Sequence, residues 1–139
     1  WWDTHVKGYE TMRDGFLPRW DQAYTALLQD LEERGLMDSV MVIAWGEFGR
    51  SPKVNKTGGR DHYPNVFSAA VAGGGIQGGA VVGSSDSKGA LPKERPVRPQ
   101  DVLATMYRHL GIDTRVKYAS FSGLPSPVLP YGDPIDELF

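Results

Sequence analysis

Residues 40–50 read VMVIAWGEFGR, an apolar run followed by a polar turn between two glycines. A short continuous apolar run that ends at a glycine is typical of a strand buried on both faces. Ligands of open α/β sheets bind beyond the carboxyl ends of the strands, and Glu47 occupies such a position. We therefore consider Glu47 a candidate ligand or general base. Arg50 is a candidate to bind a phosphate or sulfate, although it can equally pair with Glu47.

A helix is predicted before this strand. From Pro18 to about Arg34, large apolar residues recur at three- and four-residue steps, at positions 20, 24, 27, 28 and 31. Pro18 suits the first turn of a helix, and Gly35 suits the cap at its end. A helix followed by a buried strand is the second half of a β–α–β unit, so the pattern predicts the α/β class.

The remaining elements follow from the same periodicities. Further strands are predicted at residues 1–6, 67–72 and 80–82, a turn at Asp14-Gly15, and a second helix from Pro99 to Leu110. Between the second and third strands lies a long polar loop, residues 46–66, of the kind that is usually functional or mobile. The glycine-rich residues 73–79 lack the lysine of a nucleotide loop and indicate a tight turn. From about residue 118 the chain is rich in proline and is predicted to wrap irregularly over the surface, with only Val128-Leu129 resembling a strand.

The composition limits the classes of function. The 139 residues correspond to a single domain, and a content of 40% hydrophobic and 23% charged residues is ordinary for a globular protein. A net charge of −2 gives no basic surface for nucleic acid, and no apolar run approaches the roughly 20 residues that a membrane span needs. Because the chain has no cysteine, a bound metal ion must take oxygen and nitrogen ligands.

Two clusters carry side chains that bind divalent metals. Asp3 and His5 are two residues apart, so on a strand they point to the same face. Asp61 and His62 are adjacent in the long loop and follow Arg60. Carboxylates and imidazoles together suit zinc and similar ions, and they also suit acid–base chemistry. The alternative is that both pairs are ordinary solvated polar residues, and the two hypotheses differ in whether the side chains converge.

These motifs closely resemble the C-terminal part of the family called domain of unknown function 1501. The resemblance runs nearly from end to end of the chain. It is carried by Trp2-Asp3-Thr4-His5, Arg34-Gly35-Leu36, Gly46-Glu47-Phe48-Gly49-Arg50, Gly59-Arg60-Asp61-His62, Ala72-Gly73-Gly74-Gly75-Ile76, Val81-Val82-Gly83, Leu110-Gly111-Ile112-Asp113 and Pro134-Ile135. Because the resemblance covers only a C-terminal part, and because the chain begins with Trp1-Trp2, we expect a fragment of a longer domain.

The family is similar to a branch of the alkaline phosphatase and sulfatase superfamily, which implies a three-layer αβα sandwich. By order along the chain, Asp3 and His5 resemble the superfamily's first pair of metal ligands, and His62 resembles its last ligand. Glu47 stands in the place of an aspartate ligand, but Phe48 replaces the histidine that follows it and cannot bind a metal. In the superfamily the nucleophile comes from the N-terminal half, so this chain alone is expected to be inactive.

The leading hypothesis is therefore a fragment of a metal-dependent hydrolase of phosphate or sulfate esters. Its metal, zinc in the first instance, would be bound by residues from Asp3, His5, Glu47, Asp61 and His62, with Glu47, Arg50 and Arg60 as catalytic candidates. The alternative is a non-catalytic binding or structural module that keeps the fold without the complete metal site. The resemblance also implies an exported or periplasmic protein, and an open strand edge predicts self-association.

Overall fold

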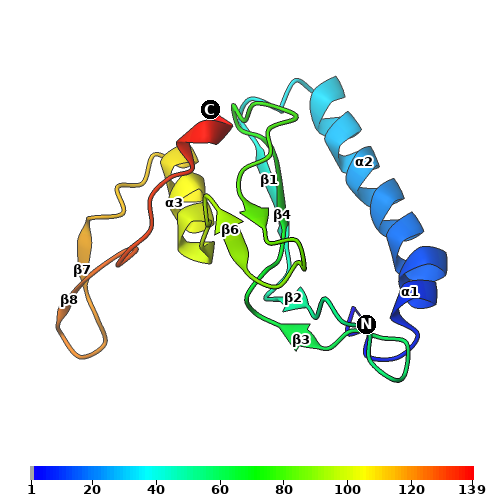
Figure 1. Ribbon diagram of the computed structural model, residues 1–139. Helices are drawn as coiled ribbons and strands as arrows, with labels where there is room; N and C mark the ends of the chain where they lie inside the picture. The colour runs from blue at the N-terminus through cyan, green and yellow to red at the C-terminus, as the bar shows by residue number, and fades with distance from the viewer. Residues whose placement is uncertain (1) are drawn as a thin grey trace.

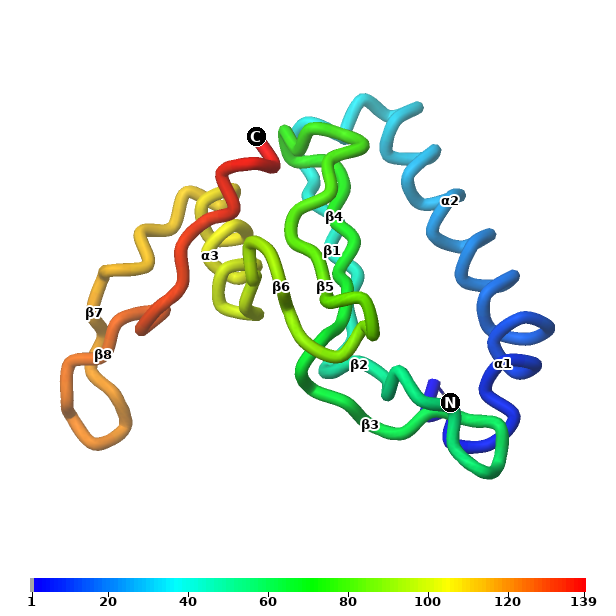
Figure 2. The backbone as a smooth tube through the Cα atoms, viewed as in Figure 1, coloured from blue at the N-terminus to red at the C-terminus, as the bar shows by residue number. Residues whose placement is uncertain are grey.

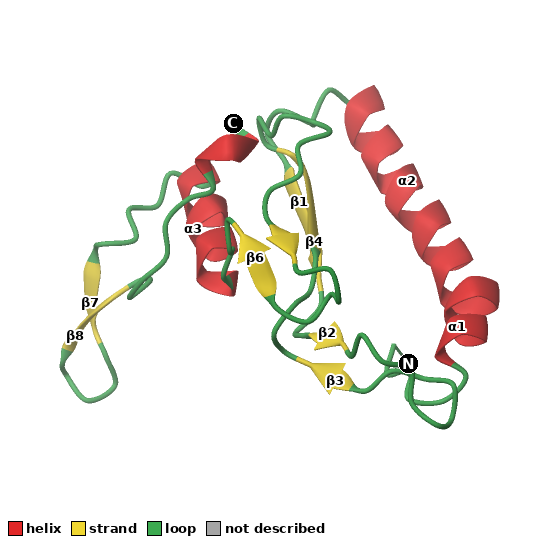
Figure 3. Ribbon diagram, in the orientation of Figure 1, coloured by secondary structure: helices red, strands yellow, loops and turns green. Residues whose placement is uncertain are grey.

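The computed structural model describes residues 2–139. Helix α2 (Leu17–Glu33) stands on one side of a two-stranded ribbon formed by β1 (Met41–Trp45) and β4 (Ala69–Gly73), and helix α3 (Pro99–His109) lies on the other side (Figure 1). The structure has α/β character and is built from helices and small antiparallel sheets (Figure 3). Within the described residues, no helix is both long and apolar enough to cross a membrane.

The first helix is confirmed, but it begins earlier than predicted. Helix α2 continues without a break from α1 (Gly8–Thr11) and a π-helical turn, η1 (Met12–Phe16). The turn predicted at Asp14-Gly15 is therefore wrong, because both residues lie in this wider helical turn, which accommodates an extra residue inside a helix. The end is as predicted: Gly35 has a φ of 66°, and the Leu36 N–H donates to the Leu31 carbonyl at 2.8 Å.

The strands predicted at 40–45 and 67–72 are confirmed within two residues as β1 and β4. They run antiparallel, with Ile43 opposite Val71. The β–α–β unit that the helix and strand suggested is wrong, because no strand precedes the helix among the described residues for β1 to pair with. Burial on both faces is wrong as well: β1 is half-buried along most of its length, and Trp45 is 43% exposed. Among the described residues β1 pairs with β4 alone, so the predicted central strand lies in a sheet of two strands.

The long polar loop between these strands is a hairpin. Its arms are β2 (Gly49–Arg50) and β3 (His62–Tyr63), and the register places Arg50 opposite His62. The segment between the arms, residues 51–61, extends toward the start of the chain and lies beside it (Figure 2).

The strand predicted at 1–6 is wrong. Trp1 lies outside the described residues, and Val6 forms only an isolated bridge with Gly58. The backbone here bonds to the loop instead: Lys7 N–H donates to Thr57 O at 3.0 Å, and Arg60 N–H donates to Thr4 O at 3.1 Å. A short segment that pairs with a curved loop cannot keep the regular ladder of a sheet.

The core lies between α3 and the C-terminal end of the chain. The second predicted helix is confirmed as α3, and its Val102 is buried with Ile135 and Leu138. Leu138 belongs to a 3-10 turn, η2 (Asp136–Leu138). Thr105, only 1% exposed, donates to the Asp101 carbonyl and accepts the Ile135 N–H at 2.9 Å. The C-terminal residues therefore form part of the core.

Two smaller strand predictions are wrong. The strand at 80–82 is absent from the described structure, where Val82 packs against the core and the neighbouring β5 (Ser84–Ser85) pairs with β6 (Pro92–Glu94). The stretch predicted to resemble a strand, Val128-Leu129, lies just after β8 (Pro125–Pro127) and outside it. Since β8 pairs with β7 (Lys117–Ala119) in a projecting hairpin, the region beyond residue 118 is not irregular throughout (Figure 1). Proline is tolerated at both ends of β8 because a two-stranded hairpin leaves one edge of each strand without a partner.

Asp101, buried at the start of α3, gives a testable pH dependence. Burial alone raises the pKa of Asp101, but hydrogen bonds from Arg98 and from the Asp133 N–H outweigh burial and lower it. Because the pKa of Asp101 is lower in the folded state, its ionised carboxylate stabilises the fold. This contribution is complete above the pKa of the unfolded state, about 3.9, and is lost as the pH falls through the pKa of the folded state. We expect Asp101→Asn to cost about 1–3 kcal/mol at neutral pH and to remove this acid-dependent loss.

Urea denaturation at neutral pH and at a pH of about 3 measures this effect, with Asp38→Asn at an exposed position as the control. If acid lowers the free energy of unfolding equally in Asp101→Asn and in the unchanged chain, the effect does not come from Asp101.

Candidate metal centre

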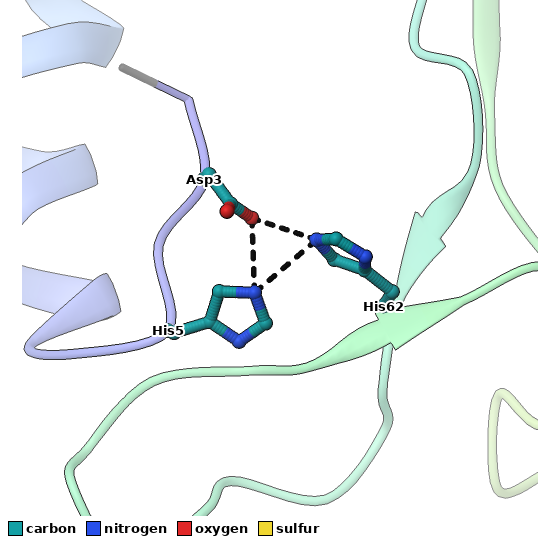
Figure 4. Close-up of side chains that lie close together, drawn as sticks. All are labelled: Asp3, His5 and His62. Carbon is teal, nitrogen blue, oxygen red and sulfur yellow. Dashed lines mark hydrogen bonds and ion pairs between the residues drawn. The ribbon is translucent and has the colours of Figure 1, made fainter.

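Asp3, His5 and His62 converge on one point near the start of the chain (Figure 4). The Asp3 Oδ1 atom lies 2.8 Å from His62 Nε2 and 3.1 Å from His5 Nε2. The two Nε2 atoms are 3.2 Å apart, although their residues are separated by 57 positions in the sequence. The side chains of Asp3, His5 and His62 are 57%, 40% and 48% exposed, so the cluster faces solvent.

The local fold explains this convergence. Asp3 and His5 approach each other because the chain turns, with the His5 N–H donating to the Asp3 carbonyl at 3.1 Å. His62 comes from β3, whose loop is bonded to residues 4–8 by several backbone hydrogen bonds. The side chains of Asp3 and His5 therefore lie together, as their spacing suggested, but through a turn and not through one face of a strand.

The spacing of the three atoms suits a metal ion. In a tetrahedral zinc site with bonds of about 2.0–2.1 Å, ligand atoms lie about 3.3 Å apart. The three separations of 2.8, 3.1 and 3.2 Å come close to this value, so the side chains would need only small movements to bind an ion. A carboxylate oxygen and two imidazole nitrogens are also the donors that zinc and similar ions prefer.

Arg50 lies beside the cluster. Its Nη2 donates to Asp3 Oδ1 at 2.8 Å and to the Trp2 carbonyl at 3.1 Å, so its ion pair is with Asp3 and not with Glu47. The hydrogen bond with His62, followed by that with Arg50, lowers the pKa of Asp3 to about 2. Asp3 is consequently ionised at neutral pH, as a metal ligand must be.

Asp61 lies behind His5, away from the point of convergence. Its Oδ1 is 2.8 Å from His5 Nδ1, on the opposite side of the ring from the nitrogen that faces Asp3. A carboxylate in this position orients the imidazole and strengthens it as a ligand. The structure therefore places Asp61 as a hydrogen-bond partner of His5, outside the group of atoms that converge, and the prediction that it belongs to that group is wrong.

The other two candidates lie outside the cluster. Glu47 is exposed beyond the end of β1 and does not belong to the converging group. The Arg60 guanidinium donates to the carbonyls of Ser51 and Pro52, where it stabilises the loop. Phe48 packs on His62, with 4.2 Å between ring centroids.

Asn55 is a residue of this site that the sequence did not single out. Its side chain bonds to the backbone of His5, Thr57 and Gly59 and to the carboxylate of Asp61. An asparagine a few residues before Gly58-Gly59 is typical of a turn in which the side chain bonds to the backbone, and this was the available signal.

Comparison with known proteins bears on the family-level part of the resemblance noted in the sequence. No curated protein and no solved structure matches the chain significantly. A family model matches all of residues 1–139, so every residue of the cluster lies inside the matched region. The chain therefore belongs to the family described as "Protein of unknown function (DUF1501)".

Proposed function

We propose that Asp3, His5 and His62 bind one divalent metal ion, and that the centre takes part in the hydrolysis of phosphate or sulfate esters. The observation that carries the proposal is the convergence of three ligand atoms within 3.2 Å of one another, from segments far apart in the sequence. Zn²⁺ is the first choice, because two imidazoles and one carboxylate suit it better than they suit Mg²⁺.

Arg50 supports an anionic substrate. Its Nη2 lies 2.8 Å from Asp3 Oδ1, so an anion bound to the proposed metal ion would lie within reach of the guanidinium. A guanidinium binds phosphate and sulfate well. A divalent metal, when bound, polarises the ester and lowers the pKa of a bound water. Arg50 then neutralises charge on the substrate, and Asp61 maintains the orientation of His5.

The residues of this chain supply metal binding and anion binding. The hydroxyls of Ser51 and Thr57, in the segment between β2 and β3, donate to backbone carbonyls. In the proposed alkaline-phosphatase-like sandwich the nucleophile belongs to another part of the fold, and the roles of Glu47 and Arg60 remain predictions. Hydrolysis is therefore expected of a longer protein that contains this chain, and metal binding is expected of the chain itself.

The second candidate is a non-catalytic binding or structural module that retains the fold without the complete metal site. It is favoured by the position of Phe48, whose ring packs on His62, and by that of Glu47 outside the cluster. Together these leave a single metal position among the described residues, whereas hydrolysis with two metals would need a second set of ligands.

Calorimetric titration of the chain with ZnCl₂ tests the proposal, with MgCl₂ as the comparison. We expect one Zn²⁺ to bind per chain, and Mg²⁺ to bind far more weakly. Hydrolysis of p-nitrophenyl phosphate and p-nitrophenyl sulfate by a longer protein then separates the two candidates. Failure of Zn²⁺ to bind would refute the proposed metal centre and leave the structural module, and Zn²⁺ binding without hydrolysis would favour a non-catalytic module.

A further inference from the structure

We infer that Asn55 is a positioning residue that fixes Asp61 against Nδ1 of His5, and so acts on which nitrogen of His5 carries the proton. Through Asp61 it holds the proton on Nδ1 and leaves Nε2 free to bind a metal. This inference rests on the proposed metal site for its purpose, but its geometry stands on contacts within the metal-free chain. The chain of hydrogen bonds runs from the backbone to Asn55, then to Asp61, and then to His5.

The first step fixes the orientation of the Asn55 amide. Its Oδ1 lies 3.0 Å from the Thr57 backbone nitrogen and 2.9 Å from that of Gly59. Its Nδ2 lies 3.0 Å from the His5 carbonyl oxygen. A backbone N–H can only donate and a carbonyl can only accept, so the amide oxygen and nitrogen are assigned from both sides.

The second step identifies the proton on His5. The same Asn55 Nδ2 donates to Asp61 Oδ1 at 3.0 Å, and this oxygen lies 2.8 Å from His5 Nδ1. The Asp61 carboxylate is ionised at the pH of about 8.5 used below, as any aspartate is, and the oxygen that faces His5 already accepts a hydrogen bond from Asn55. An ionised carboxylate only accepts hydrogen bonds, so Nδ1 of His5 must be the donor.

The third step concerns the other side of the His5 ring. A neutral imidazole with its proton on Nδ1 has an unprotonated Nε2, which is the form that binds a metal. This nitrogen is hydrogen-bonded to His62 Nε2 at 3.2 Å, at the centre of the cluster. Asp3 Oδ1, although 3.1 Å from it, takes its hydrogen bond from His62 Nε2 at 2.8 Å, so the proton that faces Asp3 belongs to His62. The backbone of the loop therefore keeps His5 in the form that binds a metal, even when no metal is bound.

The arrangement makes an unusual prediction for Asp61→Asn. A new amide beside His5 could present either its oxygen or its nitrogen, and the nitrogen would move the proton of His5 to Nε2. Because Asn55 presents a donor at this position, it selects the amide oxygen, and the Nδ1 proton is retained. When Asn55 is also replaced by alanine, this selection is lost and the Nε2-protonated form is expected to increase.

Long-range ¹H–¹⁵N correlation spectra of the imidazoles test the inference in the metal-free chain, at a pH of about 8.5 where an imidazole is neutral. We expect His5 to carry its proton on Nδ1 in the unchanged chain and in Asp61→Asn, and to shift toward Nε2 in the double variant Asn55→Ala with Asp61→Asn. His109 provides an internal reference, because it lies on α3 and faces the Ser39 carbonyl. In calorimetry, we expect the double variant to bind Zn²⁺ about 10–100-fold more weakly.

The outcomes separate this inference from the proposed function. A His5 protonated on Nε2 in the unchanged chain would overturn the role of Asn55, even if Zn²⁺ binds and the double variant does not fold. An unaltered proton position in a folded double variant would overturn it too. If the proton position is as expected and Zn²⁺ fails to bind, the positioning role stands and the proposed function fails.

Discussion

Replacement of His62 by alanine is expected to lower the affinity of the chain for Zn²⁺ by at least about 100-fold. His62 Nε2 is 2.8 Å from Asp3 Oδ1 and 3.2 Å from His5 Nε2, so its removal leaves two ligand atoms on one short segment. Mutation of a residue that only hydrogen-bonds to a metal ligand changes metal affinity about 10–100-fold, and the loss of a ligand itself is expected to exceed this range. Calorimetric titration with ZnCl₂ measures the change.

His109→Ala is the matched control for this experiment. The chain has three histidines, and His109 lies at the end of α3, where its ring contacts the Ser39 carbonyl and takes no part in the cluster. Its replacement is expected to leave the Zn²⁺ affinity unchanged. Equal affinities for His62→Ala and the unchanged chain would place the metal elsewhere, and equal losses in both variants would indicate a general effect on folding.

Local sequence patterns predicted the elements whose structure depends on local contacts. Helix α3 and most of α2 follow from apolar residues on one face, and Gly35 marks the end of α2. The β1 strand follows from its continuous apolar run, but its antiparallel partner does not. Pairing direction depends on the path of residues 46–66, which fold back as a hairpin instead of crossing over the sheet.

The site was predictable in part, because metal ligands have few alternatives in a chain without cysteine. Asp3, His5 and His62 follow from residue type, and the structure brings them together. Asp61 has the same residue type as Asp3, and only the geometry shows that it lies behind His5. Asn55 could not be selected by type, since its role depends on the loop conformation that brings Asp61 and His5 to its side chain.

Gly59 provides the most severe test of how the loop builds this site. Residues 4–8 and the loop at 55–60 lie so close together that a Cβ atom on Gly59 would be 2.1 Å from the carbonyl carbon and oxygen of His5. Neither group is the flexible end of a side chain, so the two segments would have to separate. The Arg60 N–H bond to Thr4 O would be lost with them.

Gly59→Ala is therefore expected to abolish Zn²⁺ binding although it removes no ligand. His5 would move away from His62 and Asp61, whose positions depend on the loop, while α3 and the core around Val102 should remain folded. Calorimetry and hydrogen exchange measure the two effects separately, because exchange should increase at residues 4–8 and 55–60 and stay slow in α3. Gly78→Ala is the control, since a Cβ atom there meets nothing within 4 Å. Undiminished Zn²⁺ affinity in Gly59→Ala would contradict this prediction, because it would mean that the loop backbone does not position His5.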